Sequence, residues 1–305
     1  MDGFTPTGQN DKTAKEGFPV RKLLIALMCL LLALPALAED EEFTSGDYTY
    51  VLLEDGTAQI TDYEGEDVAL EVPATLDGHA VTSIGSKAFM HNQTIVRLTL
   101  PEGLKSIEQN AFSGCFALVE LTLPDGLESI GRTAFEGCRS LTQVALPAGL
   151  TSVGEGVFNK CPALTQAFLP DDLAEISSGM FADCPSLTQV ALPDGLTRIG
   201  GGAFFNCASL TQIDLPASLT AIDRLAFRNC TSLAKVDVPE GVTSLGEVAF
   251  LNCAGLIEIS LPDSLTEIGV KVFDDCPNVK VIVGSGSYAE QYCRESGYNY
   301  ECREK

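Results

Sequence analysis

Residues 146–168 read LPAGLTSVGEGVFNKCPALTQAF, and this 23-residue unit recurs along most of the chain. Its aromatic residue returns in a fixed position: Phe89, Phe112, Phe135, Phe158, Phe181, Phe204, Phe227, Phe250 and Phe273. Three residues later stands Asn92 in the first unit, and then Cys115, Cys138, Cys161, Cys184, Cys207, Cys230, Cys253 and Cys276. A fixed period of this length is typical of a solenoid, in which each unit buries its apolar side only against its neighbours. Functional residues are therefore sought among exposed positions and departures from the repeat.

Each unit divides into a strand, a corner and a turn. Residues 141–147 alternate apolar and polar side chains and end at Pro147, which predicts a short strand. Residues 134–138 are long enough for a single helical turn, and glycines such as Gly131 and Gly154 mark a tight corner. We expect nine units over residues 72–283, forming a β-rich solenoid of parallel short strands, one per 23-residue repeat, with single helical turns.

The repeat resembles a known family. The positions that carry the resemblance are Leu123-Pro124, Leu127, Ile130-Gly131, Ala134-Phe135, Cys138, Leu141 and Val144. They are similar to the BspA-like (Treponema pallidum-type) leucine-rich repeat family over residues 72–283. The resemblance implies a leucine-rich repeat solenoid and an extracellular or surface protein of a host-associated microbe. Members of that family are linked to binding host matrix proteins or other cells.

Both ends of the repeat array carry segments that predict caps. In residues 39–71, two apolar runs flank Asp55-Gly56, which predicts a β-hairpin, and residues 68–72 predict a third strand. In residues 284–305, Ser287 and Glu290 have the spacing of a capping box, and Gly297 fits a helix C-terminus. We expect an N-terminal β cap and a C-terminal cap with one short helix near residues 288–296.

The first 38 residues predict a secretory signal peptide. Arg21-Lys22 precedes twelve apolar residues, 23–34, and Ala36-Leu37-Ala38 fits a cleavage site. The apolar run is too short for a bilayer-spanning helix, which needs ~20 residues. We expect a secreted, extracellular chain, with attachment to the cell surface as an alternative.

Secretion raises the question of disulfides. Cysteines in one column of a stack point the same way, which disulfide geometry does not allow, so we expect eight buried free thiols. Cys293 and Cys302 lie outside the column and are a candidate disulfide pair.

Charge and composition exclude several classes of function. The formal net charge is −23, and such a surface repels phosphate backbones and anionic lipids, so we expect neither nucleic-acid nor direct membrane binding. No catalytic, zinc-binding or phosphate-binding motif is present, and His79 and His91 are the only histidines. We expect no enzyme activity, no cofactor and no metal. Weak calcium binding by the acidic residues that follow the strand prolines is the alternative.

The outward positions of the strands form the candidate binding surface. At its centre, threonine and glutamine repeat, and one aromatic residue lies between Ala145 and Ala191. The candidate protein-binding residues are Phe168, Gln143, Gln166, Gln189, Thr165 and Thr188. Threonine and glutamine ladders also stabilise sheets without any ligand. A docking face with Phe168 as its anchor is the functional interpretation.

These observations lead to an expected function. We expect a non-enzymatic, secreted or cell-surface leucine-rich repeat protein that binds an extracellular or host protein through its sheet face. An extracellular glycan- or peptide-binding module is one alternative, and a structural spacer with no ligand is another. The repeat gives no signal for an oligomeric state.

Overall fold

The structure, a computed structural model, describes residues 41–303, and residues 42–303 belong to one compact unit. The expected signal peptide, residues 1–38, lies outside the described residues. No helix within residues 41–303 is both long and apolar enough to cross a bilayer.

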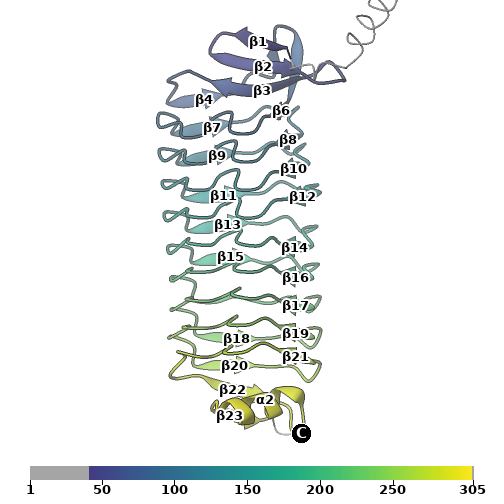
Figure 1. The fold of residues 1–305 in the computed structure, drawn as a ribbon, viewed down its shortest axis with the longest axis vertical. Helices are drawn as coiled ribbons and strands as arrows, with labels where there is room; N and C mark the ends of the chain where they lie inside the picture. The colour runs from purple at the N-terminus through teal and green to yellow at the C-terminus, as the bar shows by residue number, and fades with distance from the viewer. Residues whose placement is uncertain (1–40, 304–305) are drawn as a thin grey trace, which may run out of the picture. The chain divides into compact units, whose positions relative to one another are not determined.

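The described chain is a β-solenoid in which most rungs carry two short strands, one in each of two columns (Figure 1). The first column contains β4 (Ala69–Glu71), β7 (Arg97–Thr99), β9 (Glu120–Thr122), β11 (Gln143–Ala145), β13 (Gln166–Phe168), β15 (Gln189–Ala191), β18 (Lys235–Asp237), β20 (Glu258–Ser260), β22 (Lys280–Val283) and β23 (Tyr300–Cys302). The second contains β6 (His79–Ile84), β8 (Ser106–Ile107), β10 (Ser129–Ile130), β12 (Ser152–Val153), β14 (Glu175–Ile176), β16 (Arg198–Ile199), β17 (Ala221–Ile222), β19 (Ser244–Leu245) and β21 (Glu267–Ile268).

Pairing between rungs is parallel and follows the 23-residue period. Gln143 pairs with Gln166 in the first column, and Ser106 pairs with Ser129 in the second. The expected solenoid is therefore confirmed. The sequence pattern predicted one strand per repeat, whereas most repeats have two. After the first repeat the second strand is only two residues long, too short for its alternation to be recognised.

Phenylalanine rings form a continuous column through the interior of the stack. All nine are at most 2% exposed, and neighbouring rings stack with centroids 4.8–6.1 Å apart. Tyr63 covers the first ring at 5.1 Å, and Tyr298 covers the last at 5.5 Å, edge to face. The column is thus closed by a tyrosine from each cap, which keeps water from its ends.

The segment around each Phe is a series of hydrogen-bonded turns and not the helical turn that we expected. Ala134, Glu136 and Cys138 each donate a backbone hydrogen bond to the residue three positions earlier. The residues two before and two after each Phe are left-handed in all nine units, with φ of 52–65° and 56–74°. Two left-handed residues per unit prevent a right-handed helical turn, because α-helix requires negative φ throughout. They also aim the Phe N–H at the next rung in the first eight units, as in Phe158 N–H to Met180 O at 2.9 Å.

The corner glycines are required by the close approach of the preceding rung. A Cβ at Gly131 would lie 2.5 Å from Gln109 N and 2.6 Å from Glu108 C. These separations are well inside the van der Waals optimum of roughly 3.5–4.0 Å. At two of the corners without glycine the side chain has a polar partner: Ser177 donates to Gly154 O at 2.7 Å, and Asp223 accepts from Arg198.

The N-terminal cap continues the second strand column. β2 (Tyr48–Leu52) and β3 (Ala58–Tyr63) form the expected antiparallel hairpin, and β3 pairs in parallel with β6. A further strand, β1 (Glu42–Ser45), pairs antiparallel with β2. The expected third strand is β4, which pairs with β7 in the first column. The short strand β5 (Thr75–Leu76) folds back on β6 around Asp77 and Gly78.

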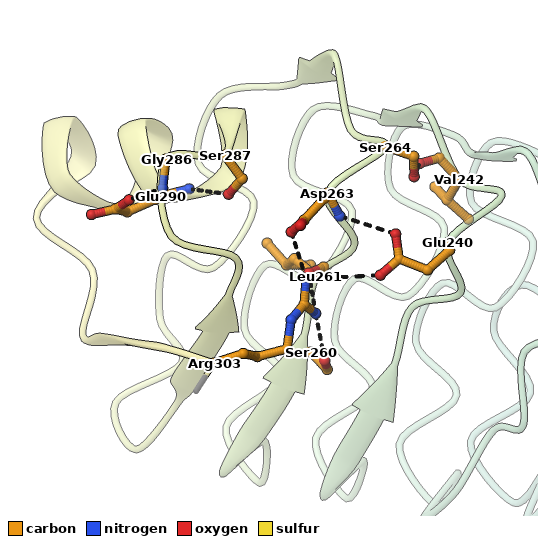
Figure 2. Close-up of polar contacts among 10 residues, drawn as sticks. All are labelled: Glu240, Val242, Ser260, Leu261, Asp263, Ser264, Gly286, Ser287, Glu290 and Arg303. Carbon is orange, nitrogen blue, oxygen red and sulfur yellow. Dashed lines mark hydrogen bonds and ion pairs between the residues drawn. The ribbon is translucent and has the colours of Figure 1, made fainter. Parts of the chain in front are cut away.

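The C-terminal cap contains the expected helix, α2 (Tyr288–Ser296). Ser287 accepts a hydrogen bond from Glu290 N, and Gly297 is left-handed at φ 75°. The Glu290 carboxylate accepts from Gly286 N at 2.6 Å, one residue before the position that a capping box predicts. After β23, Arg303 reaches back over the preceding rungs, donating to Asp263 at 2.6 Å and to Leu261 O at 2.9 Å (Figure 2). These contacts hold the end of the described chain against the stack.

The phenylalanine column generates a stability prediction. Replacing Phe158 by Ala removes a fully buried ring from the middle of the column, so the free energy of unfolding should fall by ~3–5 kcal/mol. Chemical denaturation measures this change. Phe168→Ala is the matched control, since that ring is 52% exposed and should cost far less. Equal losses for the two variants would contradict the buried column.

The close packing at the corner glycines generates a second stability prediction. Gly131→Ala places a methyl group against the backbone of the preceding rung and should lower the free energy of unfolding by about 1–3 kcal/mol. Gly103→Ala is the control, because its Cβ would lie 3.8 Å from its nearest neighbour, Val81 O. An unchanged denaturation midpoint for Gly131→Ala would show that the rungs are not this close.

Candidate functional site

The first strand column presents the candidate face. In each rung the middle residue of the strand points into the core, as Val144, Ala167 and Val190 do, so the residues on either side of it point outward. Gln143, Gln166 and Gln189 lie side by side in parallel register. The structure thus brings together the aligned glutamines that the sequence predicted.

Phe168 lies on this face between two alanines. It pairs with Ala145 on one side and with Ala191 on the other, so no large neighbour covers its ring. The side chain is 52% exposed. Among the described residues the only other exposed Phe or Tyr side chain is Tyr288 of the C-terminal cap, at 44%. An apolar ring exposed to this extent at the centre of a polar face is the strongest feature of the surface.

Threonine and glutamine play different parts on the face. The Thr165 hydroxyl donates to Thr142 O at 3.0 Å, and the Thr188 hydroxyl donates to Thr165 O at 3.1 Å. These hydroxyl protons are used to join rungs, as expected of a stabilising ladder. Of the glutamines at 143, 166, 189 and 212, only Gln212 has a side-chain hydrogen bond to another described residue. The other three amides keep their donors and acceptors available at the surface.

A shallow hollow of about 350 Å³ extends the face beyond Phe168. Four of the predicted residues line it: Gln166, Phe168, Thr188 and Gln189. Gln143 and Thr165 lie outside its lining. Gln212 and Asp214 also line it and are not among the residues predicted from sequence. The available signal was the acidic Asp214 in a position that is otherwise threonine, alanine or phenylalanine in the preceding rungs.

The histidines and carboxylates do not converge. Among residues 41–303, no three or more His, Cys, Asp or Glu side chains are grouped as metal ligands would be. His79 Nδ1 lies 2.9 Å from Gly56 O, and His91 occupies a left-handed turn position beside Phe116, with ring centroids 6.3 Å apart. Asp263, in the acidic row that follows the strands, is paired with Arg303 at 2.6 Å.

The eight column cysteines are buried free thiols, as expected. Each thiol donates to the carbonyl oxygen of the Phe 26 residues earlier, with sulfur-to-oxygen distances of 3.1–3.5 Å. In the first unit, Asn92 stands in this position, and its side-chain oxygen accepts instead from Thr94 N and Ile95 N. The cysteine column therefore joins successive rungs by hydrogen bonds.

The expected bridge between Cys293 and Cys302 is absent, and both thiols are free. Cys293 lies on the buried side of α2 and is fully covered by the core. Cys302 lies at the end of β23 and is half-buried, where burial and then the Glu290 carboxylate raise the pKa of its thiol. The two thiols thus have different surroundings, which corrects the prediction from sequence.

Comparison with known proteins gives one family match. Residues 82–211 and 174–293 match the BspA type leucine rich repeat region, in its six-copy form. No curated protein matches the sequence.

Several solved structures resemble the chain. A leucine-rich repeat protein of T. pallidum is 29% identical, with a TM-score of 0.47 over 86% of this chain and 98% of that one. A leucine rich cell surface protein from Faecalibacterium prausnitzii A2-165 is 24% identical, with a TM-score of 0.46 over 84% and 98%. The pneumococcal vaccine antigen PcpA is 17% identical, with a TM-score of 0.42 over 87% and 99%.

The thiols generate a prediction about chemical reactivity. Burial raises the pKa of Cys115, Cys184 and Cys230 to about 12, so at slightly alkaline pH these thiols stay protonated and unreactive. Iodoacetamide should label Cys302 first in the folded protein, and all described cysteines after unfolding in urea. Peptide mass spectrometry identifies the labelled sites. Early labelling of the cysteine column, or a bridge between Cys293 and Cys302, would contradict the structure.

Proposed function

Because the chain belongs to the BspA-type leucine-rich repeat family, we propose that it is a secreted or cell-surface protein that binds an extracellular protein through its strand face. The partner is a protein of a host or of another cell. The observation that carries the proposal is Phe168, a large aromatic side chain that is 52% exposed at the centre of the face. Phe is among the aromatic residues that are enriched at protein interfaces relative to the rest of the surface.

The surroundings of Phe168 support a protein partner. Gln143, Gln166 and Gln189 line up across three rungs, so their amides repeat at roughly the 4.8 Å spacing of neighbouring strands. Each amide offers both donors and an acceptor, which suits the mixed polar groups of a protein surface. An apolar anchor within a field of hydrogen-bonding groups is the usual composition of a docking face.

Affinity at a single face should be modest. The chain has no Trp, and its seven Tyr lie outside the nine repeats, so Phe168 is the only aromatic anchor on the central face. Many copies displayed together would compensate through multivalent attachment. This arrangement favours adhesion over tight, one-to-one complex formation. It also favours a protein partner over a glycan, which is commonly bound by several stacked aromatic side chains.

The net charge of −23 restricts the range of partners. Repulsion of phosphate groups disfavours nucleic acids and anionic membranes.

The test is binding of residues 39–305 to an array of purified extracellular matrix proteins and mucins. Phe168→Ala should weaken retention by at least about tenfold, which corresponds to ~1.4 kcal/mol. Val270→Ala is the matched control, because Val270 is 61% exposed at a corner away from the strand face. Retention that survives Phe168→Ala would exclude the strand face as the site. Retention of glycans alone would favour a carbohydrate-binding module, and retention of nothing would favour a spacer.

A further inference from the structure

The first strand column is interrupted next to Phe168. β11, β13 and β15 pair in succession, but the following rung has no strand, only an isolated bridge between Gln212 and Lys235. Up to that point the backbone N–H of Thr165 and Thr188 each bind the preceding rung, at 2.9 and 3.0 Å. Thr211 lacks the corresponding bond to Thr188 within the described residues, and the series resumes at Ala234.

The interruption is confined to this face. In the second column the same rungs stay paired, Arg198 with Ala221 and Ala221 with Ser244. In the core, Ile213 remains buried at 4% exposure. The interior of the stack therefore continues unbroken while its outer strand surface opens at residues 211–215.

Two hollows meet at the interrupted rung. The hollow of about 350 Å³ runs from Phe168 to Asp214, and a second of about 460 Å³ continues past Lys235 and Asp237. Thr211, Gln212 and Asp214 line both. The opening is thus continuous along the stack from the aromatic anchor to an acidic stretch.

The charges along this opening are unbalanced. Gln212 donates to both oxygens of Asp214 at 2.9 and 3.0 Å, and no Lys or Arg of the described chain pairs with that carboxylate. The one nearby ammonium, Lys235, is held by Glu258 at 3.0 Å and Asp237 at 3.7 Å. The carboxylates of Asp214, Asp237 and Glu258 therefore outnumber the single Lys235 ammonium. The exposed Asp214 carboxylate is the one whose charge has no partner.

We propose that this opening receives an extended segment of the partner protein that carries an apolar side chain and, about three residues away, a Lys or Arg. The apolar side chain covers Phe168 and Ala191, and the cation pairs with Asp214. The spacing follows from the repeat: Phe168 and Asp214 are two rungs apart, roughly 10 Å, and an extended chain advances roughly 3.3 Å per residue. The inference rests on the proposed binding by the strand face and adds the chemistry of the partner.

The test uses synthetic peptides of stated sequence. The probe is Ser-Gly-Leu-Ser-Ser-Arg-Gly-Ser, immobilised at high density, with versions in which Glu replaces Arg, Ser replaces Leu, or Leu and Arg are adjacent. Residues 39–305 should bind the probe more tightly than all three altered peptides. Asp214→Asn should weaken binding of the probe roughly two- to fivefold, the range for one surface ion pair. It should also reduce the sensitivity of binding to added salt.

Asp194→Asn is the matched control, because Asp194 is an exposed carboxylate outside both hollows and should leave binding unchanged. Equal binding of the Arg and Glu peptides, or no effect of Asp214→Asn, would overturn the cationic segment. If Phe168→Ala still weakens retention on the matrix-protein array by at least about tenfold in that case, the proposed function stands without this inference. If neither Asp214→Asn affects peptide binding nor Phe168→Ala affects retention on the array, both this inference and the proposed function are wrong.

Discussion

Stacking of identical rungs around a dry column of phenylalanine rings is the constraint on which the rest of the structure depends. No single unit of this length can bury its own apolar side. In the first eight units the Phe N–H binds the rung that follows, whereas each thiol of the cysteine column binds the Phe carbonyl of a preceding rung, as Cys138 does with Phe112. A rung is therefore joined in both directions, by ring contact and by hydrogen bonds. The corner glycines allow the backbones to come this close, and the two capping tyrosines exclude water from the ends.

This constraint decides which residues are free for function. Phe, Cys and the middle residue of each strand are held in the core, so only the flanking outward residues of the strand are free to vary. On the central rungs these are small or hydrogen-bonding residues, with the exception of Phe168. The threonine hydroxyls at 165 and 188 are consumed in joining rungs, whereas the neighbouring glutamine amides stay available. Function on such a scaffold depends on single departures from the repeat. Phe168 and Asp214 are two such departures, and both line one opening.

Residues that recur every 23 positions allowed most of the fold to be predicted. The Phe and Cys columns, the hairpin around Asp55-Gly56 and the helix that begins after Ser287 are all present. Features that depend on backbone geometry were missed. The second strand column is too short to show alternation, and the left-handed turn positions are filled by residues as different as Gly156, Thr133 and Val248. The interruption at Gln212 was invisible, because Ile213 keeps the buried pattern although the backbone bond from Thr211 to the preceding rung is lost. Asp214 was not recognised as part of the candidate site, although its charge departs from the residues at the same position in the preceding rungs.

Hydrogen exchange of the backbone amides tests the central claim most directly, because in the middle of the stack the Phe N–H is bonded to the next rung and the ring beside it is buried. Mass spectrometry of peptides that contain Phe135, Phe158 and Phe181 measures this exchange in the middle of the stack. We predict that the Phe amides in all three peptides exchange only with an opening free energy close to that of global unfolding. Exchange as fast as that of an exposed loop, in even one of these rungs, would contradict a continuous, in-register stack.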